Sequence, residues 1–424
     1  MPDSSVPPHP PAADRPLPAG DLLIDAEDTA GPAPRPAHPL LVAAGLVLVA
    51  LNLRPALSSV SPVLAELVRD TGVSATAASV LTTVPVLCLG VFGLLAPRLA
   101  QRRGAERVVL AAVAVLAAGL ALRLVPWYAA QLAASVIAGA GIGVAGALLP
   151  GIVKRDFADR PALMTGVYTM ALCAGAAIAA GATVPLAGGP DGWPVALAFW
   201  ALPAAVAALV WLPLLPRRTP GAAPPPRQPV RGLWRDPLAW QVTLFMGLQS
   251  SLAYIVLGWL AVILRDRGLG ATAAGLVVSV SVLVQVAAAL IGPVLAARRR
   301  SQGGAAAIAL VLTVAGMLGC LFAPVGTVWL WAVLLGLGQG ASFAIALTLI
   351  VLRAGDSHVA AHLSGMAQSV GYTLAAAGPF AVGLLHDRTG SWAATGVLTV
   401  VVGAAAIAAG FGAGRDRVVL SGVR

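Results

Sequence analysis

Long apolar runs separated by short polar segments dominate the chain from residue 39 onward. A helix of about 20 residues crosses the hydrocarbon core of a bilayer, and runs of this length recur with only brief interruptions. We count twelve candidate spans, at residues 39–63, 76–97, 106–125, 128–153, 161–187, 193–215, 238–264, 271–296, 304–325, 328–352, 359–386 and 392–413. The pattern predicts an all-α integral membrane protein with twelve transmembrane helices.

The composition supports this interpretation. Of the 424 residues, 58% are hydrophobic and only 10% are charged, and the mean hydropathy is +0.88. A soluble protein carries about 25% charged residues, so a soluble fold is excluded. The formal net charge is +10. Because the arginines lie in short loops between apolar runs, membrane topology explains them better than nucleic-acid binding does.

The residues that usually carry enzyme or metal chemistry are sparse. Cys88, Cys173 and Cys320 all fall inside apolar runs, and their spacing indicates neither a disulfide framework nor a metal site. The chain has no phosphate-binding loop and no plausible nucleophile–base pair. We therefore expect no cofactor, no bound metal and no enzymatic activity. A sensor that does not transport is also disfavoured, because the short linker and tails offer no output domain.

The polar segments divide the chain. Residues 1–38 are rich in proline and alanine and cannot bury a core, which predicts a disordered tail. The proline-rich, basic segment 216–237 is typical of a linker. The linker separates two six-helix bundles, 39–215 and 238–413, and residues 414–424 form a short tail.

The two predicted bundles repeat each other. Residues 97–103 (PRLAQRR) match residues 293–299 (PVLAARR) 196 positions further on, and MTG at 164–166 matches LSG at 363–365. Repeated halves are typical of transporters, which bind solute between the halves and rock one half against the other. We therefore expect a solute site between the bundles.

The loop charges predict the orientation. With the amino terminus inside the cell, the inner segments hold 21 of the 27 Lys and Arg residues. One more lies within a span, and the outer segments hold five, Arg69, Arg123, Arg265, Arg267 and Arg388. Basic residues accumulate on the cytoplasmic side of membrane proteins. The count predicts a plasma-membrane protein with both termini in the cytoplasm.

The first span contains an unusual charge. Arg54 and Pro55 lie near its middle, in the stretch LNLRPALSSVSP at 51–62. A buried arginine costs at least about 2.5–3.5 kcal/mol on insertion scales, and a proline leaves the carbonyl of Leu51 without its helical donor. A charge beside a loosened helix is typical of a solute site. Ser58 lies on the same helix face as Arg54.

Arg54 has two interpretations. It either binds a solute or serves as a structural arginine that bonds to the freed backbone carbonyls. Within the spans the acidic residues Glu66, Asp266 and Asp387 all lie near the ends, so Arg54 lacks an obvious intramembrane ion-pair partner. This favours contact with an anion.

Other polar side chains in the spans are candidates for binding the same solute. Asn52 and Gln249 occupy matching positions in the two halves, and Ser364, Gln368 and Tyr372 form a stripe on the eleventh span. Amides can also serve to join membrane helices. The predicted solute-binding residues are Arg54, Asn52, Ser58, Gln249, Ser250, Tyr254, Gln339, Gln368 and Tyr372. Weaker candidates are Thr165, Tyr168, Thr169, Gln285 and Ser342.

Two histidines begin the eleventh span. His358 and His362 are four residues apart, a spacing that suits a metal pair, but no third ligand lies nearby in the sequence. Histidine titrates near neutral pH, so a proton-linked role is the other possibility. The coupling ion stays open at this point, because no carboxylate lies at mid-span.

The architecture resembles the major facilitator superfamily. The loop after the second span looks like a degraded form of its G-x-L-x-D-R-x-G-R signature, in which Arg102 and Gly104 match while Pro97 replaces the first glycine and Gln101 replaces the acid. Five stretches also resemble the cyanate and nitroimidazole transporter family, namely LNLRPALSSVSP (51–62), LLPGIVKRDF (148–157), GLQSSLAYIVLGWL (247–260), GQGASFAIALTLIVLR (338–353) and LSGMAQSVGYTLAAAGPF (363–380). The resemblance implies transport of small anions or small heteroaromatic compounds.

Together these patterns predict a monomeric secondary transporter that works by alternating access. Arg54 would hold a small anionic or polar heteroaromatic solute between the two bundles, and protons are a candidate coupling ion. The alternative is a drug-type efflux transporter for weakly acidic or neutral compounds.

Overall fold

The computed structural model describes residues 39–73, 75–188, 192–215, 230 and 232–420. The described residues from Pro39 onward form one compact unit and contain helices and no strands. The predicted tail 1–38 and most of the predicted linker lie outside them. The all-α fold predicted from the apolar pattern is confirmed.

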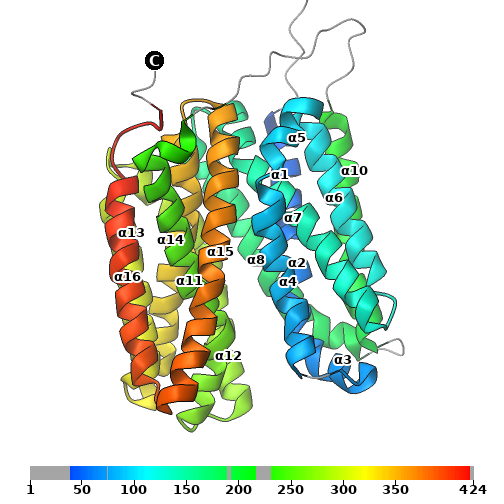
Figure 1. The fold of residues 1–424 in the computed structure, drawn as a ribbon, viewed down its shortest axis with the longest axis vertical. Coiled ribbons are helices and arrows are strands. Elements are labelled where there is room, and N and C mark those ends of the chain that lie inside the picture. The colour runs from blue at the N-terminus through cyan, green and yellow to red at the C-terminus, as the bar shows by residue number, and fades with distance from the viewer. Residues whose placement is uncertain (1–38, 74, 189–191, 216–229, 231, 421–424) are drawn as a thin grey trace, which may run out of the picture. The chain divides into compact units, whose positions relative to one another are not determined.

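The first half of the chain contributes the helices that hold Arg54. Figure 1 shows the longer of them running alongside one another, with the short α3 at their lower end. They are α1 (Pro39–Leu53), α2 (Pro55–Ser58), η1 (Ser61–Val63), α3 (Leu64–Thr71), α4 (Ala75–Gly93), α5 (Ala96–Arg103), α6 (Ala105–Leu122), α7 (Tyr128–Asp156), α8 (Pro161–Ala187), α9 (Gly192–Ala198), α10 (Ala201–Trp211) and η2 (Leu212–Leu214).

The second half has fewer and longer helices. The side chain of Asp236 caps the first of them by accepting hydrogen bonds from the backbone N–H groups of Leu238 and Ala239, as helix N-caps do. The elements are η3 (Leu233–Arg235), α11 (Pro237–Asp266), α12 (Ala271–Ala297), α13 (Gly303–Phe322), η4 (Val325–Thr327), α14 (Val328–Arg353), α15 (Ser357–Thr389) and α16 (Ala393–Ala413).

The helices account for the twelve predicted spans. Ten described segments are long and apolar enough to cross a membrane, and the bent pair of α4 and α5 adds an eleventh. The remaining span is α15, which has 33 residues and carries the predicted polar stripe. Its polar residues lower its hydropathy, but its length exceeds the about 20 residues that a span requires.

Three predicted spans are interrupted. The first is broken between α1 and α2 at Arg54, as the proline at position 55 suggests. At the end of the second, the chain bends by 50° into α5, so residues 98–103, which we predicted as a loop, are helical. The sixth is split into α9 and α10 around residues 199–200, a break that we did not predict. Helix α10 and η2 complete the sixth span.

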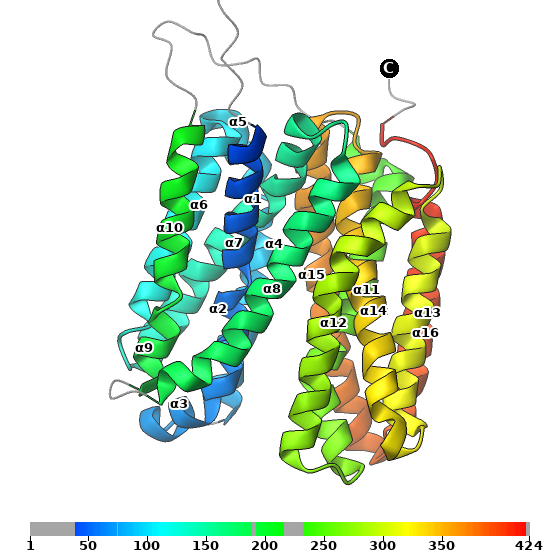
Figure 2. The ribbon, with the colours of Figure 1, turned by 180° about the vertical axis from the view of Figure 1, so that it is seen from behind.

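Helices of the two halves contact each other in two separate groups. Helix α15 packs against α4, α5 and α7, while α8 packs against α12 and α14. Figure 2 shows α8 and α12 as neighbours. We call the end of the bundle where α1 begins and α16 ends the terminal end, and the opposite end, where α11 and α15 finish, the far end.

Close backbone approach brings α7 against α15 at the terminal end. A Cβ atom on Gly151 of α7 would lie 2.9 Å from the carbonyl oxygen of Ser357, the first residue of α15. Only a glycine allows the two helices this separation, as is common where membrane helices pack. The halves are therefore tightly packed at the terminal end.

Candidate functional site

Arg54 occupies the break in the first span. Pro55 is the first residue of α2 and has no N–H group to donate, so the helical ladder stops and restarts here. The backbone N–H groups of Leu57 and Ser58 then donate to the carbonyl of Arg54, at 3.0 and 3.1 Å. The interruption predicted from the Arg-Pro sequence places the guanidinium at the junction of two helices.

Arg54 lines a small cavity between the halves. The cavity measures about 30 Å³ and draws its walls from α1, α2, α4, α7 and α8 in the first half and from α14 and α15 in the second. Its lining residues are Leu53, Arg54, Leu57, Leu89, Ile142, Gly146, Leu149, Tyr168, Leu172, Phe343, Leu347, Gln368 and Tyr372. The walls are mostly apolar, with a few polar groups around one charge.

The charge of Arg54 is not neutralised by an acid. Among the described residues no carboxylate lies within ion-pair distance of its guanidinium, and no hydrogen bond from the guanidinium reaches the backbone around Pro55. Its carbon Cζ lies 4.9 Å from the centre of the Phe343 ring, which is a cation–π contact. Tyr254, Tyr372 and Cys173 also lie near it.

Gln368 and Tyr372 reach the cavity from α15. The side-chain amide of Gln368 donates to the hydroxyl of Ser364 at 2.7 Å and to the carbonyl of Gly146 at 3.2 Å, so it also joins the two halves. The ring of Tyr372 packs edge-on against that of Tyr254, with centroids 6.4 Å apart. The stripe that we predicted on the eleventh span therefore faces Arg54.

Six predicted residues do not line the cavity in this conformation. One of them, Tyr254, packs its ring against that of Tyr372. The polar groups of the other five bond within their own half, because a buried amide or hydroxyl needs a partner close by. Asn52 donates to the carbonyl of Leu48, Ser58 to that of Arg54, and Gln249 to that of Met246 and to the hydroxyl of Ser250. Gln339 accepts from Gln285. Helix joining accounts for these contacts, and solute contact by these residues remains a prediction.

Two residues near the break were not predicted from the sequence to contact it. Phe343 lies one helical turn after Gln339 on the same face of α14, and that spacing could have suggested it as a cavity residue. Arg123 was counted among the outer loop residues, but its side chain is fully buried. It donates to the carbonyl of Ala56 at 2.8 Å and to the hydroxyl of Ser59 at 3.4 Å. No sequence signal distinguished it from an exposed loop arginine.

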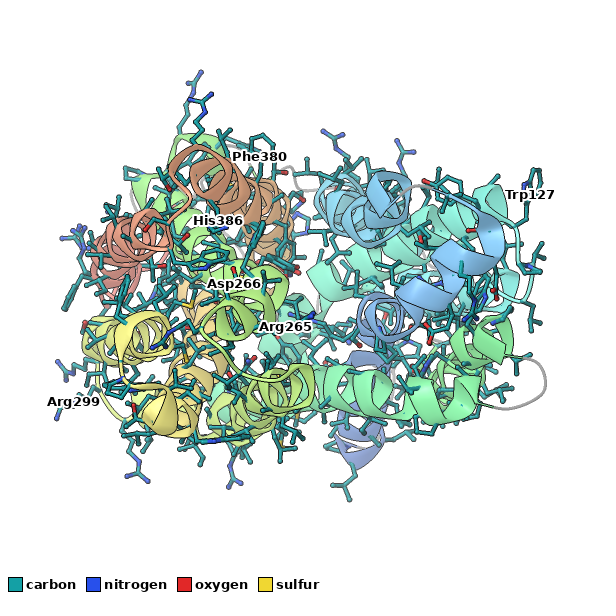
Figure 3. The ribbon with its side chains drawn as sticks, turned by 90° about the horizontal axis from the view of Figure 1, so that it is seen from below. Trp127, Arg265, Asp266, Arg299, Phe380 and His386 are labelled. Atoms are coloured by element: carbon teal, nitrogen blue, oxygen red, sulfur yellow. The ribbon has the colours of Figure 1, made fainter. Side chains whose placement is uncertain are left out.

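The far end carries a separate cluster of aromatic and charged groups. Figure 3 shows Arg265 and Asp266 at the end of α11, with His386 of α15 in the same region. The indole of Trp392 donates to Asp266 at 3.2 Å, and the imidazole of His386 stacks on Trp392 with centroids 3.9 Å apart. Asp266 is therefore engaged at the rim and does not pair with Arg54.

Comparison with known families identifies this arrangement. Residues 46–379 match the Major Facilitator Superfamily. The chain belongs to this superfamily. It is 35% identical over 379 residues to the 2-nitroimidazole transporter of Escherichia coli (strain K12), which covers 89% of this chain and 96% of the relative. It is 32% identical over 348 residues to the cyanate transport protein CynX of the same organism. That alignment covers 82% of this chain and 90% of the relative.

Solved structures of the major facilitator superfamily share the fold. The proton:xylose symporter XylE bound to 6-bromo-6-deoxy-D-glucose superposes with a TM-score of 0.72, over 88% of this chain and 94% of that chain, at 12% sequence identity. At that identity the likeness concerns the fold alone. The resemblance to cyanate and nitroimidazole transporters is confirmed, and the protein is a multi-pass membrane transporter of the superfamily.

Proposed function

We propose that the protein is a secondary transporter that binds a small anionic or polar heteroaromatic solute at Arg54, between its two halves. The observation that carries this proposal is a guanidinium in a mostly apolar cavity, with no carboxylate among the described residues to neutralise it. A buried charge without a counter-ion is costly, and an anionic or strongly polar ligand removes part of that cost.

The other cavity groups suit such a solute. A planar ring could stack against Phe343, Tyr168 or Tyr372, all of which line the cavity, and the amide of Gln368 both donates and accepts hydrogen bonds. Guanidinium groups bind planar anions through paired N–H donors. The names of the two relatives, a 2-nitroimidazole transporter and a cyanate transport protein, agree with this solute class.

The size of the cavity supports a mechanism in which the halves move. Its volume of about 30 Å³ is far below the about 300–1,000 Å³ of small-molecule sites. A solute can therefore enter only if the helices around Arg54 separate. Rocking of the two halves about this site is the simplest way to admit a solute from one side at a time.

Solute-induced thermal stabilisation tests the role of Arg54. Purified protein is titrated with cyanate and, separately, with 2-nitroimidazole, and the unfolding midpoint is followed. We expect Arg54→Gln to weaken binding by about 10- to 100-fold, because a hydrogen bond to a charged group contributes about 1.5–3 kcal/mol. Arg54→Lys keeps the charge but loses the planar donor pair, and should bind with intermediate affinity.

Arg265→Gln is the matched control. It removes the same charge from an exposed position at the far end, so binding should stay at the wild-type level. Wild-type affinity in Arg54→Gln would refute the proposal. The wild-type protein could instead bind uncharged and anionic compounds equally, and Arg54→Gln could leave both affinities unchanged. That result would support the alternative of an efflux transporter for neutral compounds.

A further inference from the structure

One side-chain cluster joins the two halves at the terminal end. The amide nitrogen Nε2 of Gln101, on α5, lies 2.7 Å from Nε2 of His362 and 3.2 Å from Nε2 of His358, both on α15. The two imidazole rings meet edge to face, with centroids 4.8 Å apart. We call these three residues the Gln101–histidine cluster. It brings together the glutamine that replaces the signature acid and the two histidines noted in the sequence.

The cluster lies where the halves are in close contact. Gly151 of α7 packs against Ser357 at the start of α15, one residue before His358. Six residues beyond His362 on the same helix, Gln368 bonds to Gly146 of α7 at the wall of the Arg54 cavity. Separation of the halves at the terminal end must therefore break the contacts of Gln101 and also move a cavity residue.

Burial and the neighbouring groups together disfavour a protonated His362 in the closed state. Burial contributes most, and His358 and Arg98, the latter on α5 beside Gln101, add to it. Both are neutral or positive, and among the described residues no carboxylate lies within ion-pair distance of His362. A proton on His362 would therefore place a positive charge beside Arg98 in a partly buried position.

The carboxylates on neighbouring elements are engaged elsewhere. Asp356, the cap of α15, accepts from the backbone N–H of Val359 at 2.8 Å. At the end of α7, which finishes with Lys154, Arg155 and Asp156, the acids Glu106 and Asp156 pair with Arg155, at 2.6 and 2.7 Å. At the end of α14, Arg353 lies 3.7 Å from Asp416. None of these acids is placed to stabilise a charged His362.

We propose that His362 is a proton-binding site whose protonation opens the terminal end of the transporter. In the closed state a neutral His362 accepts a hydrogen bond from the amide of Gln101. Because the closed state disfavours the charged imidazole, proton uptake shifts the population towards the open state, and a rise in pH restores closure. The inference concerns the gate and does not depend on which solute Arg54 binds.

Distance measurements between the halves test the gate. Spin labels are attached to Arg103→Cys on α5 and Gly355→Cys just before α15, both at exposed positions, in a background whose native cysteines are buried. The full-length protein in lipid nanodiscs is measured without solute from about pH 8 to about pH 5.5, a range that brackets ordinary histidine titration. We expect the longer-distance population to grow as the pH falls, by at most about tenfold per pH unit, the limit for one proton.

Three variants decide the interpretation. His362→Gln should abolish the pH dependence. Gln101→Glu places a carboxylate beside His362 and should hold the protonated imidazole in the closed state, so that low pH no longer opens the gate. This variant keeps the histidine, so it tests the charge and not the loss of the side chain. Arg265→Gln, an exposed substitution at the far end, should keep the wild-type pH response. A pH-independent wild-type distance, or a wild-type response in His362→Gln, would overturn the proposal.

Discussion

Two arginines near the break in the first span have different environments. Arg54 faces a cavity and meets an aromatic ring, whereas Arg123 is fully buried and bonds to the carbonyl of Ala56 and the hydroxyl of Ser59. The carbonyls at the carboxyl end of a one-turn helix such as α2 have no helical partners, and a positive charge is favourable there. Arg123 thus stabilises the short helix that follows Arg54.

The second half contains a comparable contact with no solute candidate beside it. Arg267, just after α11, donates to the carbonyls of Cys320 and Ala323 at the end of α13. In each half a guanidinium therefore joins the far-end parts of the first and third membrane spans. The two arginines are matched in chemistry, and only Arg123 bonds to the segment that carries Arg54.

Replacing Arg123 with leucine should weaken solute binding through Arg54. The change leaves the buried Ala56 carbonyl without its donor, which costs about 1–3 kcal/mol, and α2 loses the contact that fixes it. We expect about a tenfold loss of affinity in the thermal-shift titration. Arg267→Leu should lower the unfolding midpoint about as much as Arg123→Leu does. It should leave the affinity for solute at the wild-type level. Equal affinity losses in both variants would show that Arg123 has no specific positioning role.

At the scale of elements, α8 packs directly against the break between α1 and α2. Pro55 leaves the carbonyl of Leu51 without a helical donor, and α8 approaches that carbonyl at Gly175. A Cβ atom on Gly175 would lie only 2.0 Å from the Leu51 oxygen. The closeness of α8 to this backbone therefore requires a glycine at position 175.

Gly175→Ala should destabilise the protein and disturb the solute site. Overpacking of this kind costs about 1–3 kcal/mol, because α8 or the α1 backbone must move. The unfolding midpoint of the purified protein and the affinity for solute should both fall. Gly181→Ala, on the same helix, is the control: its Cβ would meet nothing within 4 Å, and alanine favours helix by about 1 kcal/mol. The prediction is wrong if the two variants have the same midpoint.

At the scale of the whole molecule, the chain places most basic side chains at one end of its helices. The ends of α5, α7, α12 and α14 lie at the terminal end with their arginines. At the far end, Arg69, Arg265 and Arg388 lie in the last turns of their helices, and Arg267 follows α11. The positive-inside rule then predicts that the terminal end faces the cytoplasm. The gate at Gln101 would open to the cytoplasm and would respond to cytoplasmic pH.

Labelling of intact cells tests this orientation. Arg388→Cys and Arg299→Cys place one thiol at each end of the second half, both at exposed positions. A membrane-impermeant maleimide should label Arg388→Cys in intact cells and Arg299→Cys only after the membrane is permeabilised. The reverse pattern would place the termini outside and contradict the orientation predicted from the loop charges.

The sequence by itself determined the fold class, the number of spans and the break at Arg54. These depend on features that act locally: runs of apolar residues long enough to cross a bilayer, and a proline that removes a helical donor whatever surrounds it. The stripe of Gln368 and Tyr372 was also readable, because helical periodicity puts both on one face of α15. The resemblance to a transporter family rested on the same linear patterns.

Only the tertiary structure decided which polar groups meet. Asn52, Gln249 and Gln339 look like Gln368 in the sequence, but they bond within their own half, whereas Gln368 joins the halves beside Arg54. The burial of Arg123 and the meeting of Gln101 with His362, 261 positions apart, depend on how separate helices pack. A buried polar group takes whichever partner that packing brings within reach, and local sequence does not specify that partner.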